Sequence, residues 1–291
     1  MPMETKERKR KRRTSSKSDA QLTYTQPKVF NRNRFLLRLA TVLAIVLALV
    51  FAMSIFFRVE TVNVSGVNKY TEYEVFEASG IREGEYILTL SKSRISNQIM
   101  YKLPYVKKVQ IGRSLPGTVN IWVEEVDITY AAEAQDGSWW LMDSRGKILE
   151  SIHAGQVAGH TKLLGFTLAV PQIGEQAVAF EQPMEETLPD GQTVPVTVTA
   201  AEHLQAMISL LQTMEQNGIL GQAVSVDVSK LSDMEIWYGN QYQIQLGDGQ
   251  NLEYKLKLIR GAIDQMGDYR SGMLDVSFYI RPDEVIYTPF E

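Results

Sequence analysis

The sequence has no cysteine and only three histidines among its 291 residues. A chain without cysteine can form neither a disulfide framework nor a catalytic thiolate. His153, His160 and His203 lack the spacing at which paired side chains on one helix bind a metal ion. We therefore expect no metal centre and no cysteine chemistry.

The motifs of common enzyme classes are also missing. The chain has no G-x-S-x-G turn, no phosphate-binding loop and no dinucleotide-binding fingerprint. The segment Gly247-Asp-Gly249 has the glycines of a turn without the residues that would bind a phosphate. The adjacent carboxylates Glu124-Glu125 and Glu185-Glu186 are better explained as solvated charge than as an acid–base pair. These absences predict a protein that is not an enzyme and has no cofactor and no small-molecule substrate.

Charge is distributed unevenly along the chain, although the formal net charge is only −4. Residues 1–38 contain twelve Lys or Arg and three acids, whereas residues 39–291 carry a net charge of −13. The hydrophobic content of 44% lies in the ordinary globular range, so a polytopic membrane protein is excluded. The composition predicts a basic arm and an acidic folded body on opposite sides of a boundary.

One long apolar run, Leu39–Phe57, supplies that boundary. Its nineteen uncharged residues would form roughly 29 Å of helix, which is enough to cross a bilayer core once. A buried globular helix would show a polar face, but only Thr41 and Ser54 interrupt this run. A cleaved signal peptide normally has a shorter apolar region and a small-residue cleavage site. We therefore interpret residues 39–57 as a retained transmembrane helix.

The basic residues around the run predict its orientation. Arg32, Arg34 and Arg38 precede it, whereas Arg58 is followed by Glu60. Because lysine and arginine are enriched on the cytoplasmic side of a span, we expect residues 1–38 to be a cytoplasmic tail and residues 58–291 to lie outside the cytoplasm.

The basic run Arg8–Arg13 within the tail could bind nucleic acid or anionic lipid. Its short length and its polar connection to a membrane helix favour lipid. The tail up to Tyr24 has few apolar residues and is expected to be disordered.

The first part outside the membrane reads as a small α+β domain, residues 58–126. A capping box, Thr71 with Glu74, begins a short helix that Gly80 ends, and Pro104 stops a second helix. Alternating valine and isoleucine residues indicate strands. The expected order is strand 59–66, helix 71–80, helix 93–101, strand 106–111 and strand 119–123, with a turn at 114–117.

Residues 127–291 read as a mixed, strand-dominated domain. A second capping box, Thr199 with Glu202, begins a helix that ends at Asn217-Gly218. The proline-rich polar stretch 175–195 is expected to be a loop or an insertion. The other expected elements are strands 130–134, 139–142, 147–149, 224–228, 235–238, 242–246, 273–280 and 284–287, and a helix over 256–266.

With its elements in this order, the chain resembles the bacterial cell-division family DivIB/FtsQ, which combines a basic tail, one span, a POTRA-type domain and a β domain. The resemblance covers nearly the whole chain and rests on several short motifs. In the first domain these are Val62-x-Val64-x-Gly66, Ser79-Gly80-Ile81 with Gly84, Leu103-Pro104-Tyr105-Val106 with Lys107 and Val109, Arg113, Pro116, Thr118 and Ile121-x-Val123-x-Glu125. In the second they are Trp140-Leu-Met-Asp143, Gly146-Lys-Ile-Leu149, Gln243 to Gly247, Lys255-Leu256 and Gly272-x-Leu274-Asp275-Val276.

Membership of this family would imply a noncatalytic scaffold at the division septum. Such a scaffold binds the bitopic coiled-coil proteins of DivIC/FtsB and FtsL type and links them to septal cell-wall synthesis. The sequence departs from the family pattern at Val126-Asp127-Ile128, where a proline is common, and in the insertion 175–195.

The segment that follows Leu274-Asp275-Val276 is the predicted partner-binding site, because the family binds its partner with the corresponding strand. A strand at the edge of a sheet can pair with a strand of another chain, and aromatic residues and arginine are common anchors of interfaces. The alternative is that about half of the apolar side chains fill the core of the domain. The candidate residues are Phe278, Tyr279, Ile280, Arg281, Val285 and Tyr287.

Two other classes remain as alternatives. A POTRA-bearing secretion or membrane-assembly component would normally add a β-barrel, for which roughly 165 remaining residues, some of them helical, offer little room. An extracytoplasmic cell-wall enzyme would need a catalytic constellation, and the sequence offers none that we can recognise.

Overall fold

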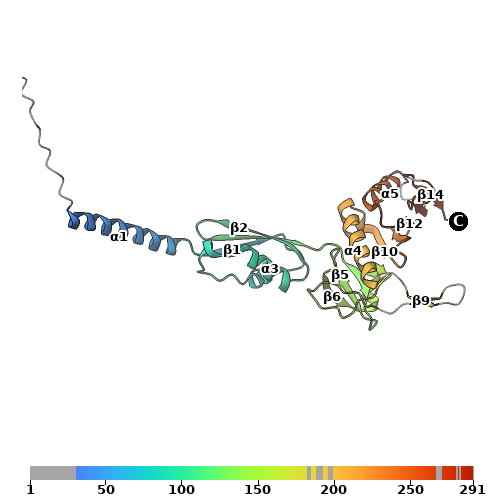
Figure 1. Ribbon diagram of the computed structural model, residues 1–291, viewed down its shortest axis with the longest axis horizontal. Helices are drawn as coiled ribbons and strands as arrows, with labels where there is room; N and C mark the ends of the chain where they lie inside the picture. The colour runs from blue at the N-terminus through green and yellow to red at the C-terminus, as the bar shows by residue number, and fades with distance from the viewer. Residues whose placement is uncertain are drawn as a thin grey trace, which may run out of the picture. The chain divides into compact units, whose positions relative to one another are not determined.

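The apolar run forms one long helix, α1 (Arg32–Phe56), in the computed structural model (Figure 1). The structure describes residues 31–181, 185–187, 193–195, 199–266, 271–279, 281 and 283–290, so the disorder expected up to Tyr24 lies outside the described residues. Within them, α1 is the one helix long and apolar enough to cross a membrane, and none of its residues is buried. The chain forms two compact units, Met1–Ala52 and Met53–Glu291.

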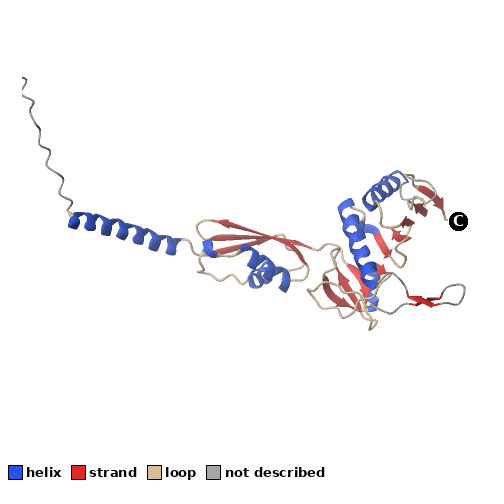
Figure 2. Ribbon diagram, viewed as in Figure 1, coloured by secondary structure: helices blue, strands red, loops and turns tan. Residues whose placement is uncertain are grey.

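The second unit begins with a small sheet, made of three strands in the described part of the chain. Strand β3 lies in the middle, parallel to β1 and antiparallel to β2. The order strand, helix, helix, strand, strand is the predicted one (Figure 2). The elements are β1 (Thr61–Ser65), α2 (Glu72–Ser79), the 3-10 helix η1 (Ile87–Thr89), α3 (Lys92–Lys102), β2 (Val106–Ser114) and β3 (Thr118–Glu125).

Local sequence signals determine the ends of these helices. Thr71 and Glu74 form the predicted capping box at the start of α2, and Gly80 ends it with a left-handed φ of 66°. Alternate residues of β3 are buried against both helices, which therefore cover the same face of the small sheet. This core includes Val75, Ile95, Ile99, Val119, Ile121 and Val123.

A large sheet follows, with nine described strands in the order β14-β13-β12-β11-β10-β7-β4-β5-β6. The strands are β4 (Tyr130–Glu133), β5 (Trp139–Met142), β6 (Ile148–Ile152), β7 (Thr161–Leu164), β10 (Ala223–Asp227), β11 (Met234–Tyr238), β12 (Tyr242–Gly247), β13 (Gly272–Asp275) and β14 (Ile286–Pro289). The helices are α4 (Ala200–Asn217) and α5 (Leu252–Met266), with 3-10 helices η2 (Ala154–Gly159) and η3 (Leu220–Gln222). Strands β8 (Glu185–Thr187) and β9 (Thr193–Pro195) pair separately, within and at the end of the polar stretch 175–195.

Strand β7 joins the two halves of the large sheet. It runs parallel to β4 on one side and to β10 on the other. The sequence analysis missed this strand, because its four residues show no alternation and follow directly on the 3-10 helix η2. The remaining strands pair mostly as antiparallel neighbours, so the fold is α+β as predicted.

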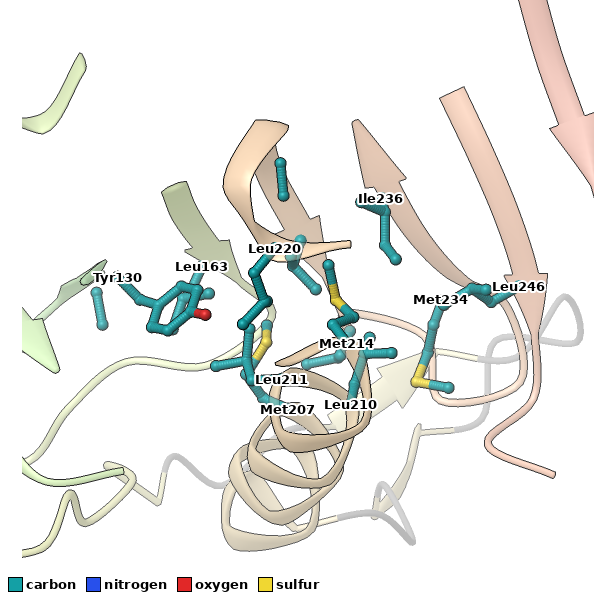
Figure 3. Close-up of a cluster of buried hydrophobic side chains, with 14 of the residues drawn as sticks. Tyr130, Leu163, Met207, Leu210, Leu211, Met214, Leu220, Met234, Ile236 and Leu246 are labelled. Atoms are coloured by element: carbon teal, nitrogen blue, oxygen red, sulfur yellow. The ribbon is translucent and has the colours of Figure 1, made fainter. Parts of the chain in front are cut away.

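Helix α4 supplies the centre of the main core. Its capping box, Thr199 with Glu202, and its left-handed Gly218 are the predicted signals. Figure 3 shows side chains from successive turns of α4 pointing toward strands of both halves of the sheet. These side chains are Met207, Leu210, Leu211 and Met214, which are fully buried.

A third cluster of buried side chains connects the small and large sheets within the second unit. Tyr105 packs with Leu141 and Leu149 in this cluster. Its hydroxyl donates a 2.5 Å hydrogen bond to Glu150 Oε1, and Lys69 Nζ lies 3.4 Å from the same oxygen. We call these contacts the interdomain seam.

Candidate partner-binding edge

Strand β14 lies at one edge of the large sheet, where among the described strands it pairs with β13 alone. The amide of Phe290 donates to Ser271 O, and Leu274 pairs with Tyr287 in the same register. The N–H and C=O groups of successive residues in an antiparallel strand point alternately toward and away from the neighbouring strand. Those of Phe290 point toward β13, so those of Tyr287, three residues earlier, point away from it. Within β14 the edge therefore offers the N–H and C=O of Tyr287 to a further strand, whereas Pro289, in the same outward phase, offers a C=O but has no N–H.

The strand predicted over 273–280 is shorter in the structure and ends at Asp275. Asp275 Oδ1 accepts a 2.8 Å hydrogen bond from the amide of Ser277, which bends the chain out of the sheet. Phe278 then has a φ of +64°, a left-handed conformation that cannot continue a strand. The predicted strand 284–287 begins later, at Ile286.

The five predicted site residues that the structure describes divide into two groups. Tyr279 is 63% exposed and Arg281 is exposed with an ion pair to Glu284, so both can meet a partner. The side chains of Phe278, Val285 and Tyr287 pack against the main core. The placement of Ile280 lies outside the described residues.

A buried lysine fixes the loop that packs against this segment. It was not among the predicted site residues. Lys255, on α5, is 1% exposed. Its Nζ donates to Leu246 O at 2.8 Å, to Asp248 O at 3.0 Å and to Asp248 Oδ1 at 3.1 Å. The hydrogen bond from Lys255 lowers the pKa of the Asp248 carboxyl. A lysine on the apolar side of a helix, between Leu252 and Ile259, is the signal that could have identified it.

The loop that Lys255 fixes touches the candidate site directly. A side chain at Gly247 would lie 2.8 Å from Ser277 Cβ and 3.2 Å from a ring atom of Tyr279, so only glycine permits this approach. The Lys255 ammonium lies 5.6 Å from the centre of the Phe278 ring, within the range of a cation–π interaction. Tyr279 is further held by a 2.5 Å hydrogen bond from its hydroxyl to Ser232 O.

A pair of stacked aromatic rings lies at the end of β14. The ring of Phe290 stacks on that of Trp237, with centroids 5.9 Å apart, and Phe290 is 42% exposed. Trp237 lies on β11, which does not pair with β14. The strand pairing of β14 alone would therefore not predict that Trp237 lies beside Phe290. The ring of Phe290 thus gives the end of β14 an exposed apolar surface.

Elsewhere the ionisable groups stabilise the fold. A cleft of about 260 Å³ near the seam is lined by Lys107, Tyr130 and Glu215, among others. Burial would raise the pKa of Glu215, but hydrogen bonds from Lys107 and Ser144 outweigh it and lower that pKa. The described residues contain no group of three or more His, Cys, Asp or Glu that could hold a metal ion.

Comparison with known proteins bears on both domains. Residues 57–125 match the family model described as POTRA domain, FtsQ-type. The chain is 23% identical over 228 residues to a protein named cell division protein DivIB from Clostridium acetobutylicum, covering 78% of this chain and 82% of that one. It is 22% identical over 229 residues to a DivIB of Clostridium botulinum, covering 78% and 81%. An FtsQ of Corynebacterium glutamicum is 30% identical over 90 residues, 31% of this chain and 40% of that one.

Proposed function

Because the chain belongs to the DivIB/FtsQ family of cell-division proteins, we propose that it is a noncatalytic scaffold that binds bitopic coiled-coil division proteins through the edge of its large sheet. The partners are of DivIC/FtsB and FtsL type, and through them the scaffold is linked to septal cell-wall synthesis. The observation that carries this proposal is the open side of β14, the strand that follows the exposed Tyr279 along the chain.

The mode of binding follows from the chemistry of the edge. A partner strand would take the outward N–H and C=O of Tyr287, while side chains next to the edge select its sequence. Tyr279 and Phe290 offer exposed rings, and Arg281, two residues after Tyr279 in the chain, adds an exposed cation. Phe278, Val285 and Tyr287 contribute by holding the strand in place, since they pack against the core.

The proposed location is the cell membrane at the septum, with the amino terminus in the cytoplasm. Support comes from the division role of the family, from the single candidate span α1 and from the arginines that precede it. The domain limits that we propose are 1–38 for the tail, 39–57 for the span, 58–126 for the POTRA-type domain and 127–291 for the β domain.

Tyr279→Glu tests the edge, because it places a charge where an apolar contact is proposed. Capture of a DivIC/FtsB-type partner by the full-length variant in detergent should be lost, while its unfolding transition stays that of the wild type. Tyr101→Glu is the matched control, since Tyr101 is 72% exposed on α3, outside the large sheet, and should capture the partner normally.

Two outcomes would count against this proposal. Equal capture by wild type and Tyr279→Glu would reject the site. Failure of the wild type to capture any partner of this type would reject the scaffold itself, and the secretion or membrane-assembly role would then be the class to test. Hydrolysis of purified cell-wall material by the protein would instead favour an enzyme.

A further inference from the structure

The end of the POTRA-type domain at which β1 begins carries two exposed leucines that the core does not use. Leu88 lies in η1 and is 42% exposed, and Leu115 lies in the turn between β2 and β3 and is 58% exposed. Turns are normally polar, so an exposed leucine at the tip of one is unusual. We call residues 57–60, 82–90 and 113–117 the domain tip.

The backbone ties the tip to the end of the apolar run. The amide of Ile87 donates a 3.0 Å hydrogen bond to the carbonyl oxygen of Phe57, the last residue of that run, and the amide of Gly84 donates to Val59 O at 2.8 Å. On the other side, the amide of Glu60 donates to Gly117 O at 2.8 Å. The backbone near Leu88 and Leu115 is therefore bonded to Phe57, at the end of the proposed span, and to Val59 and Glu60, which follow it.

These hydrogen bonds keep Leu88 and the loop before it close to Phe57. If Leu39–Phe57 spans the membrane, Phe57 lies at the boundary of the hydrocarbon core, about 15 Å from its centre. Leu88 directly follows the residue whose amide reaches the Phe57 carbonyl. The Arg58 guanidinium also donates to Gly84 O, at 3.3 Å, which joins the interfacial arginine to the same loop.

The charges of the tip do not favour an ionic partner. Its bases are Arg58, Arg82 and Arg113, and its acids are Glu60, Glu83 and Glu85. These six charges cancel, so attraction to anionic headgroups would be weak. Exposed apolar side chains next to a membrane-spanning segment are instead suited to the interface between headgroups and acyl chains.

We propose that the domain tip rests on the bilayer, with Leu88 and Leu115 immersed in the lipid interface. The contact adds a second attachment to the span and restricts the tilt of the domain against the membrane. It goes beyond partner binding, but it depends on the span that the proposed function also requires.

The absence of cysteine makes a direct test possible. The full-length variants Leu88→Cys, Leu115→Cys, Tyr101→Cys and Leu47→Cys would be labelled with a polarity-sensitive fluorophore and reconstituted in phosphatidylcholine vesicles. Nitroxide groups at known depths on the lipids then report the depth of each label by quenching. Tyr101 is the matched control, because it is an exposed ring in the last turn of α3, at the other end of the domain.

Labels at 88 and 115 are expected to be quenched most strongly by shallow nitroxides, with emission shifted to shorter wavelength. The label at 101 should show neither effect, and the label at 47 should be quenched by deep nitroxides. If 47 is deep while 88 and 115 behave like 101, the tip does not touch lipid and the inference is wrong. If 47 is not quenched, the span itself is wrong and both proposals fail.

Discussion

At the scale of single residues, the buried Lys255 fixes the conformation of backbone next to the candidate site, although its own side chain is not exposed there. Its ammonium satisfies the carbonyl of Leu246 at the end of β12 and that of Asp248 just after it, and Gly247 between them packs against Ser277 and Tyr279. A buried cation is tolerated only when its hydrogen bonds are all made. The conformation of the candidate site is therefore coupled to one side chain on α5.

Lys255→Met keeps the length of the side chain but removes all three donors. Leaving the Leu246 and Asp248 carbonyls without a partner should cost about 1–3 kcal/mol of unfolding free energy, measured by urea unfolding followed by tryptophan fluorescence. Lys257→Met removes an exposed i,i+4 pair with Glu253 and should leave the unfolding free energy almost unchanged. Equal losses in the two variants would contradict the role given to Lys255.

At the scale of secondary-structure elements, β6 joins the POTRA-type domain through Glu150. The hydrogen bond from the Tyr105 hydroxyl lowers the pKa of Glu150, and Lys69 adds to this effect against the cost of burial. The seam is thus stabilised by the ionised carboxylate. That stability is present above the ordinary pKa of 4.5 and is lost as the pH falls through the lower, folded value.

Unfolding of wild type and Glu150→Gln compared from pH 7 to pH 3 tests the seam. The wild type should be the more stable protein at pH 7, and the difference should shrink as the pH falls below 4.5 and through the lower, folded pKa of Glu150, where the carboxylate is protonated. The exposed Glu133→Gln on β4 is the control and should follow the wild type throughout. A pH-independent difference would mean that the seam depends on packing alone.

The elements also show what the sequence could and could not predict. The capping boxes at Thr71 and Thr199 predicted both helix starts, because these signals are local. Strand β7 was missed, since its four residues become a strand only by pairing with β4 and β10, which are distant in sequence. The last strands were predicted too long or too early, because a left-handed phenylalanine leaves no sequence signal.

The candidate site was predictable only in part for the same reason. An aromatic segment after Asp275 could be recognised in the sequence, but not that Tyr279 is exposed while Tyr287 packs on the core. The stacking of Trp237 on Phe290 depends on the order of strands in the large sheet. Sheet order is a non-local property that one sequence does not reveal.

At the scale of the whole molecule, the proposal requires the folded body to lie outside the cytoplasm at the septum. A fluorescent protein fused to the amino terminus should concentrate at mid-cell, and depletion should give filaments. Protease added to spheroplasts should digest the carboxyl-terminal half while the cytoplasmic tail stays intact. Protection of the carboxyl-terminal half, beside digestion of a known surface protein, would reverse the orientation.

The position of β14 has a consequence for the timing of assembly. Among the described strands of the large sheet, β14 comes last along the chain, and it pairs with β13, which in turn pairs with β12. Domains tend to fold as the chain emerges, amino-terminal parts first. If β14 is the partner-binding edge, a nascent or truncated molecule that lacks this strand would be anchored and largely folded yet unable to recruit its partners.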